Sequence, residues 1–286
     1  MIKHYFKLIK PGIIIANLIS VTGGFFFASY NYININMLFY TLLGTALVIA
    51  SGCLFNNIID IDIDKKMVRT KNRILLQSLH FILYIKILGI FFLLLGCSIL
   101  FLKVNILSSL LSVIGFLIYV GMYSLYMKRR TMYSTIIGSL SGSIPPLIGY
   151  CSVSHIIDFK SILLFIIFSL WQIPHSYSIL IFYIEDYKRS KIPVVSIKKG
   201  ILKTIIDIIF YIFLFFMFII LLYIFKYISL IFMMILSVLN IFWLCISCLC
   251  YLFYKHSCYF RLLFYWSIFV IFTLNFMFIL NFFKYI

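Results

Sequence analysis

Long apolar runs, separated by short polar segments, make up most of the sequence. Runs of about twenty residues, the length that a helix needs to cross the hydrocarbon core of a membrane, recur along the chain. They show no alternation of period two, and a helix satisfies every backbone polar group within one span. The pattern predicts an all-α bundle of nine transmembrane helices, at residues 12–30, 36–57, 80–102, 106–127, 133–153, 161–184, 201–223, 228–252 and 262–282.

The composition supports a membrane protein. Hydrophobic residues fill 65% of the 286 positions and charged residues only 11%, whereas soluble domains carry about 25% charged residues. No linker or soluble segment stands out, so we expect a single membrane-embedded domain over residues 1–286. The seven cysteines lie mostly within apolar runs, which indicates buried free thiols.

The formal charge of +17 follows the predicted topology. With the N-terminus in the cytoplasm, 19 of the 24 lysines and arginines fall on the cytoplasmic side, as the positive-inside rule requires. The excess of positive charge therefore needs no nucleic-acid partner. We expect a multi-pass protein of a bacterial cytoplasmic (inner) membrane, with the lipid bilayer around it. Its two long charged loops, 58–78 and 185–200, place the expected active site at the cytoplasmic side.

The stretch NNIIDIDIDKKMVRTKNR, residues 56–73, holds three of the seven acidic residues. Asn56, Asp60 and Asp64 are four residues apart, so on a helix they drift by only about 40° per step and form one stripe. Asp62 lies about 200° from Asp60 and should face elsewhere. Hard oxygen ligands suit Mg²⁺ that carries a diphosphate, and carboxylates at the membrane edge are costly unless used. The stripe therefore predicts a magnesium–diphosphate site.

The alternative is that these aspartates only offset the neighbouring cations in a solvated loop. If the stripe does bind diphosphate, the cations that follow it become candidate phosphate contacts, since guanidinium groups bind phosphate through paired hydrogen bonds. The same choice applies to YMKRR at the end of span 4, which either only marks the cytoplasmic side or adds cations to the site. The candidates are Arg69, Lys71, Arg73, Lys128, Arg129 and, in the second charged loop, Lys191.

A second constellation is WQIPHSYSILIFYIEDYKRSKIP, residues 171–193. Pro174 should break the helical hydrogen bonding inside span 6, and His175 follows it within the membrane, where an ionisable residue indicates a site by default. The alternative for His175 is a hydrogen bond to a carbonyl that Pro174 frees. Asp186 is the best candidate for a second metal or water contact. In span 1, Asn17 needs a polar partner, either a ligand or a neighbour.

These residues resemble the intramembrane aromatic prenyltransferases. The motifs are most similar to the branch of protoheme IX farnesyltransferases, the heme O synthases, and the resemblance runs from KPGIIIANLISVTGG near the N-terminus to about residue 200. Spans 7 to 9 carry no matching motif. The segments that carry the resemblance are ASGCLFNNIIDIDIDKKMVRTKNR, GMYSLYMKRR, SLSGSIPPLIGY, SLWQIPHSYSILIF and DYKRSKIPV.

The resemblance implies transfer of the farnesyl group of farnesyl diphosphate to a vinyl group of heme B, with addition of water, giving heme O. It implies Mg²⁺ as cofactor, Asn56, Asp60 and Asp64 as the metal–diphosphate motif, and Lys128 with Arg129 as its basic pair. His175, and with it Asn17, becomes a candidate contact to the heme. A heme-modifying enzyme or a terminal oxidase would use the product.

One departure from the wider superfamily concerns the second charged loop. Many members carry a second Asp-x-x-x-Asp there, whereas Asp186 is followed four residues later by Ser190. A second Mg²⁺ held entirely by carboxylates is therefore in doubt. Two rival functions stay open at this point, a prenyltransferase for a quinone-precursor aromatic acid and a membrane transporter.

Overall fold

The computed structural model describes residues 7–30, 32–71, 82–254 and 256–283, and within these it is helical without strands. Nine helical segments of this described part are long and apolar enough to cross a membrane, which confirms the predicted bundle. They are Pro11–Ala28, Ile35–Ile59, Ile82–Lys103, Ile106–Arg130, Ser134–Ser154, Phe159–Phe182, Ile201–Ile224, Leu230–Leu252 and Ser257–Phe283.

The first and last spans close the bundle against each other. Helix α2 (Pro11–Ala28) packs on α3 (Ile35–Ile59), α10 (Ile144–Ser154) and α16 (Ser257–Phe283). Helix α11 (Phe159–Phe182) packs on α14 (Ile201–Ile224) and α16, while α6 (Ile82–Lys103) covers α3 from outside. The spans therefore enclose a common interior instead of forming a row.

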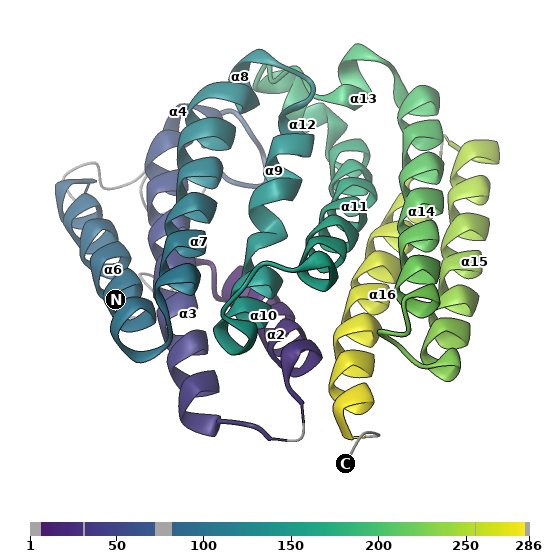
Figure 1. The fold of residues 1–286 in the computed structure, drawn as a ribbon. Helices are drawn as coiled ribbons and strands as arrows, with labels where there is room; N and C mark the ends of the chain where they lie inside the picture. Colours follow the sequence, from purple (N-terminus) through teal and green to yellow (C-terminus); the bar gives the residue numbers. More distant parts are fainter. Residues whose placement is uncertain (1–6, 31, 72–81, 255, 284–286) are drawn as a thin grey trace.

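The charged connections gather at one end of the bundle. Figure 1 shows α4 (Ile61–Asp64), α8 (Lys128–Arg130), α12 (Ile184–Arg189) and α13 (Val195–Lys198) at that end, and the C-terminus at the opposite end. This is the up-and-down arrangement that nine spans predict. We call this the charged end; that it faces the cytoplasm stays a prediction.

Two spans depart from regular α-helix. Span 4 begins as α7 (Ile106–Phe116), continues as a π-helical segment, Leu117–Met127, and ends as α8. Span 5 consists of α9 (Ser134–Gly142) and α10, which meet at Ser143. Prolines occupy the first turn of α10, where a missing backbone N–H costs nothing. Pro174, in contrast, does not end α11, which runs on through it to Phe182, so the predicted break in span 6 is limited to the one hydrogen bond that proline cannot donate.

Glycines bring α2 and α10 close together. A Cβ atom on Gly24 would overlap the backbone oxygen of Pro146, and one on Gly149 would overlap that of Val21. Small residues allow such close approach between membrane helices. This contact fixes α2 beside the interior of the bundle.

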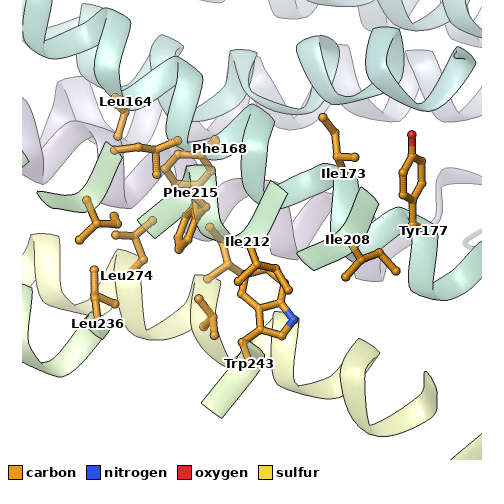
Figure 2. Packing of buried hydrophobic residues seen from close by; sticks show 14 of the residues in the cluster. Leu164, Phe168, Ile173, Tyr177, Ile208, Ile212, Phe215, Leu236, Trp243 and Leu274 are labelled. Carbon is orange, nitrogen blue, oxygen red and sulfur yellow. The ribbon is translucent and has the colours of Figure 1, made fainter. Parts of the chain in front are cut away.

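The largest part of the core joins α11 to the three C-terminal spans. Figure 2 shows Phe168 of α11 beside Phe215 of α14, and Trp243 of α15 (Leu230–Leu252) beneath Ile212. The Phe215 and Trp243 rings meet edge to face, with centroids 6.0 Å apart. Because Phe168 also lines the central cavity described below, this packing supports one of its walls.

Candidate functional site

A cavity of about 970 Å³ occupies the interior of the bundle. Its walls come from α2, α3, α4, α7, the π-helical segment, α8, α9, α10, α11, α12 and α16. The charged and polar lining at the charged end includes Lys10, Asn56, Asp60, Asp64, Arg69, Thr70, Lys128 and Tyr187. Deeper in the bundle the lining is largely aromatic and aliphatic, and includes Phe168, Trp171, His175, Phe264, Ile271 and Phe272.

The predicted stripe of Asn56, Asp60 and Asp64 lies along this cavity. Helix α3 ends at Ile59, but Asp60 N–H donates to the Asn56 carbonyl (3.0 Å) and Asp64 N–H to the Asp60 carbonyl (2.8 Å). The four-residue register therefore survives the interruption. All three side chains are buried.

Two lysines bind the first two residues of the stripe, Asn56 and Asp60. The Asn56 amide nitrogen donates to Asp60 Oδ2 (2.9 Å), and the Lys128 ammonium group donates to the same oxygen (2.5 Å). Lys10 Nζ donates to Asn56 Oδ1 at 2.7 Å. Sequence reasoning missed Lys10 as a site residue. Its backbone has a φ of 53° at the N-terminus of α2, an unusual conformation for a residue with a Cβ, and this becomes visible only in the fold.

The stripe has the donor chemistry for a divalent cation. Asp60 Oδ1 is buried and accepts no hydrogen bond from the described residues, and such an orphaned oxygen is costly unless a ligand satisfies it. Two carboxylates and one amide oxygen leave room for phosphate oxygens and water around Mg²⁺. The described chain offers no group of three His, Cys, Asp or Glu side chains for a metal, so this mixed set is what the fold provides.

Asp62 faces away from the cavity, as the helix geometry predicts. Its side chain is 57% exposed, and both of its oxygens accept from Arg129 at 2.6 Å. Hydrogen bonds from Arg129 hold the pKa of Asp62 below its usual value. The guanidinium of Arg129 also donates to the Ile59 carbonyl and does not line the cavity. The alternative prediction, that the aspartates only offset neighbouring cations, therefore holds for the exposed pair of Asp62 and Arg129.

Asp186 also has a different position from the one expected of a metal ligand. It is buried, and its two carboxylate oxygens accept from the backbone N–H groups of Val68 (2.9 Å) and Arg69 (3.4 Å). These bonds fix the segment after α4, so that Arg69 reaches the cavity. The lining formed by the described residues includes Arg69 and Lys128 but omits Asp186, Lys71 and Lys191; Arg73 lies outside the described residues.

Arg69 and Tyr187 add hydrogen-bond donors at the same end. The Arg69 guanidinium lies 4.5 Å from the centre of the Tyr183 ring, and Arg69 and Tyr187 both line the cavity. Burial raises the pKa of Tyr187, so its hydroxyl stays protonated at neutral pH and can donate. Sequence reasoning missed Tyr187, because a tyrosine in a charged loop carries no spacing signal.

His175 stands in an aromatic slot between α11 and α16. Its ring stacks on Trp171 (centroids 4.8 Å apart) and lies against Phe264 (5.0 Å). Ser267 Oγ donates to the Phe264 carbonyl (2.6 Å) and lies 2.7 Å from His175 Nδ1. Because the serine proton is already engaged, its oxygen must accept from Nδ1–H, which leaves the lone pair on Nε2. The expected alternative, a bond to a carbonyl freed by Pro174, is not what this nitrogen makes.

Asn17 lines the same cavity and is half-buried. Its amide nitrogen donates to the Ile13 carbonyl at 2.8 Å within its own helix. The amide nitrogen of this intramembrane asparagine therefore finds its polar partner in the backbone of its own helix, as the sequence allowed. On α16, Asn275 also reaches the cavity lining, although spans 7 to 9 showed no recognisable motif.

Comparison with known proteins identifies relatives of both sequence and fold. A protoheme IX farnesyltransferase of Blochmanniella floridana is 49% identical over 212 residues, which cover 73% of this chain and 72% of that protein. A digeranylgeranylglyceryl phosphate synthase has the same fold, with a TM-score of 0.80 at 20% identity over 99% of both chains. A UbiA homolog from Archaeoglobus fulgidus bound to GPP and Mg²⁺ superposes with a TM-score of 0.67 at 14% identity, over 96% of this chain and 99% of that one.

The model of the UbiA prenyltransferase family matches residues 17–279. This range contains seven complete spans and the acidic stripe, together with residues 17–28 of the first span and residues 257–279 of the last. The chain is thus a multi-pass membrane protein that belongs to the UbiA prenyltransferase family.

Proposed function

We propose that this protein is a prenyltransferase that moves the farnesyl group of farnesyl diphosphate to a vinyl group of heme B, with addition of water, giving heme O and diphosphate. The relative of 49% identity carries the name of that activity. The observation that carries the proposal is one cavity whose charged end holds the acidic stripe and whose interior holds His175 between aromatic rings. Such a cavity suits an anionic leaving group and a flat aromatic acceptor.

The charged end supports departure of diphosphate. Lys10, Lys128 and Arg69 bring three cations to the cavity, and Tyr187 brings a neutral donor. Fixed donors aimed at developing charge stabilise it strongly in a site that excludes water. Asn56, Asp60 and Asp64 would hold Mg²⁺, an ion that a homolog of the same fold binds together with GPP, and a bound Mg²⁺ would supply additional positive charge to the diphosphate oxygens.

The interior supports the acceptor. Aromatic walls from Trp171, Phe264 and Phe272 keep bulk water from the allylic cation until the vinyl group attacks it. Water then enters only after the new carbon–carbon bond has formed. A transporter would need charged side chains along a path through several spans, whereas the charged lining formed by the described residues gathers at one end.

The assay that tests the proposal supplies the purified protein with farnesyl diphosphate and either heme B or 4-hydroxybenzoate. Conversion of heme B to heme O, resolved by chromatography of the extracted heme, is the expected result. Prenylation of 4-hydroxybenzoate with heme B unchanged would instead assign the protein to quinone-precursor chemistry.

Ser267 is expected to control how His175 meets the heme. If Nε2 ligates the iron, His175→Ala should remove the histidine-ligated absorption spectrum of bound heme B. Ser267→Ala should weaken heme binding about tenfold while keeping the ligand, since groups that orient metal-bound histidines change affinity by about 10–100-fold. His155→Ala is the control, because that histidine bonds Asn105 and lies outside the cavity. An unchanged spectrum in His175→Ala would rule out iron ligation.

The charged end is proposed to face the cytoplasm of a bacterial inner membrane, because most cations lie there. A cysteine in place of the partly exposed Lys199 should react with an impermeant thiol reagent only after the membrane is opened. Labelling in intact cells would reverse the orientation. The heme product would pass to a heme-modifying enzyme or a terminal oxidase.

A further inference from the structure

A smaller cavity adjoins the central one at the charged end. It has a volume of about 300 Å³ and lies between the end of α11 and the start of α16. Arg69, Ile179 and Phe264 line both cavities, so the two are adjacent, and we call the smaller one the side chamber. Its remaining walls come from Phe182, Tyr183, Arg261 and Tyr265.

The side chamber is basic and lacks acids in its described lining. It contains two arginines and no aspartate or glutamate. The Arg261 guanidinium lies 5.2 Å from the centre of the Phe182 ring, as Arg69 lies over Tyr183. No ion pair to either arginine occurs within the described part of the chain. The acidic stripe can bind an anion through a metal, whereas this chamber can bind one only directly.

Helix register connects the chamber to His175. Arg261 and Ser267 both belong to α16 and are six residues apart, which is about 9 Å along the helix axis and about 120° around it. Ser267 bonds His175, and Phe264, between them in sequence, contacts the His175 ring and lines both cavities. A ligand that contacts His175 therefore lies beside the chamber that contains the arginines, with Phe264 between them.

We propose that the side chamber binds the propionate carboxylates of the porphyrin substrate, with Arg261 as their dedicated contact. This inference rests on the proposed function. Propionates are the only charged groups on the rim of heme B, and burying them without a partner is costly. A guanidinium binds a carboxylate through two parallel hydrogen bonds. The propionates would then occupy the side chamber, apart from the diphosphate at the acidic stripe.

Heme B and its dimethyl ester, in which both propionates are blocked, separate this role from others. Binding is measured by absorption titration with the protein in phosphatidylcholine nanodiscs. Arg261→Gln should weaken binding of heme B about tenfold or more, as expected for a lost charged hydrogen bond, yet leave binding of the ester unchanged. Retained binding of the ester also shows that the variant is folded. Arg261→Lys keeps the charge but loses the paired geometry. Its affinity for heme B should lie between those of the unaltered protein and Arg261→Gln.

The matched control is Arg130→Gln. Arg130 also stacks on an aromatic ring at the charged end, 4.2 Å from the centre of Tyr126, but it lines neither cavity. It should bind both porphyrins as the unaltered protein does. Equal weakening of heme B and its ester in Arg261→Gln, or no weakening of either, would overturn the propionate site.

Lipid phosphate is the other source of an anion for this chamber. If a headgroup occupies it, Arg261→Gln should lose affinity for phosphatidylglycerol added to the nanodiscs and treat both porphyrins alike, which also overturns the proposal. Failure of the proposed function has a different signature, since heme B would then not bind the unaltered protein at all. Normal heme farnesylation, with heme B and its ester bound equally well, would overturn the propionate site alone.

Discussion

Asp60→Ala and Asp64→Ala should each lower the rate of heme farnesylation by about a hundredfold or more. Both side chains are buried beside the cavity, and each loss leaves leaving-group charge or neighbouring lysine charge uncompensated. Asp60→Ala should also destabilise the fold around the site, because Asp60 Oδ2 accepts hydrogen bonds from both Asn56 and Lys128. Removing one partner of a buried charge pair is costly in itself.

Asp62→Ala is the internal control for that result, and should keep activity within about fivefold because exposed ion pairs contribute only about 0–1 kcal/mol. Initial rates with heme B and farnesyl diphosphate, measured at matched amounts of folded protein, compare the three variants. Asp60→Asn, which preserves shape, separates lost charge from lost packing. Equal losses at Asp60, Asp62 and Asp64 would contradict the assignment of one functional stripe.

The second large effect concerns magnesium. Activity should disappear when excess chelator removes divalent cations and should return when Mg²⁺ is restored. The physical reason is the donor set, because a buried Asp60 Oδ1 without a hydrogen-bond partner among the described residues and the neighbouring Asp64 carboxylate suit a hard cation. Without the metal, only the lysines and arginine of the cavity, Lys10, Lys128 and Arg69, would remain to stabilise the charge of the diphosphate.

The magnesium dependence should also change in a residue-specific way. Asp64→Asn should need more Mg²⁺ for half-maximal activity, since a ligand charge is lost, while Asp62→Ala should keep the dependence of the unaltered protein. Binding of farnesyl diphosphate at varied Mg²⁺ gives a readout that is independent of turnover. Full activity in excess chelator would remove the metal from the mechanism.

The charged loops divide into predictable and unpredictable parts. Four-residue spacing placed Asn56, Asp60 and Asp64 on one side and Asp62 on the other, because the hydrogen-bond register continues past the end of α3. Spacing could not show that Arg129 pairs with Asp62, or that Asp186 accepts from the backbone beside Arg69. Both contacts join residues more than sixty positions apart in sequence, and the spacing of residues within one segment does not predict contacts between segments so far apart.

Sequence by itself determined the class of protein, its nine spans, the end at which charge gathers and the composition of the acidic stripe, since each depends on local length, polarity or helical period. Tertiary structure alone decided which cations reach the cavity and which side chains meet the predicted site residues. It brought Lys10 from before the first span to Asn56, and Ser267 from a span without any motif to His175. Helix packing sets these meetings, because side chains on different spans become neighbours only after the bundle closes α16 against α2 and α11.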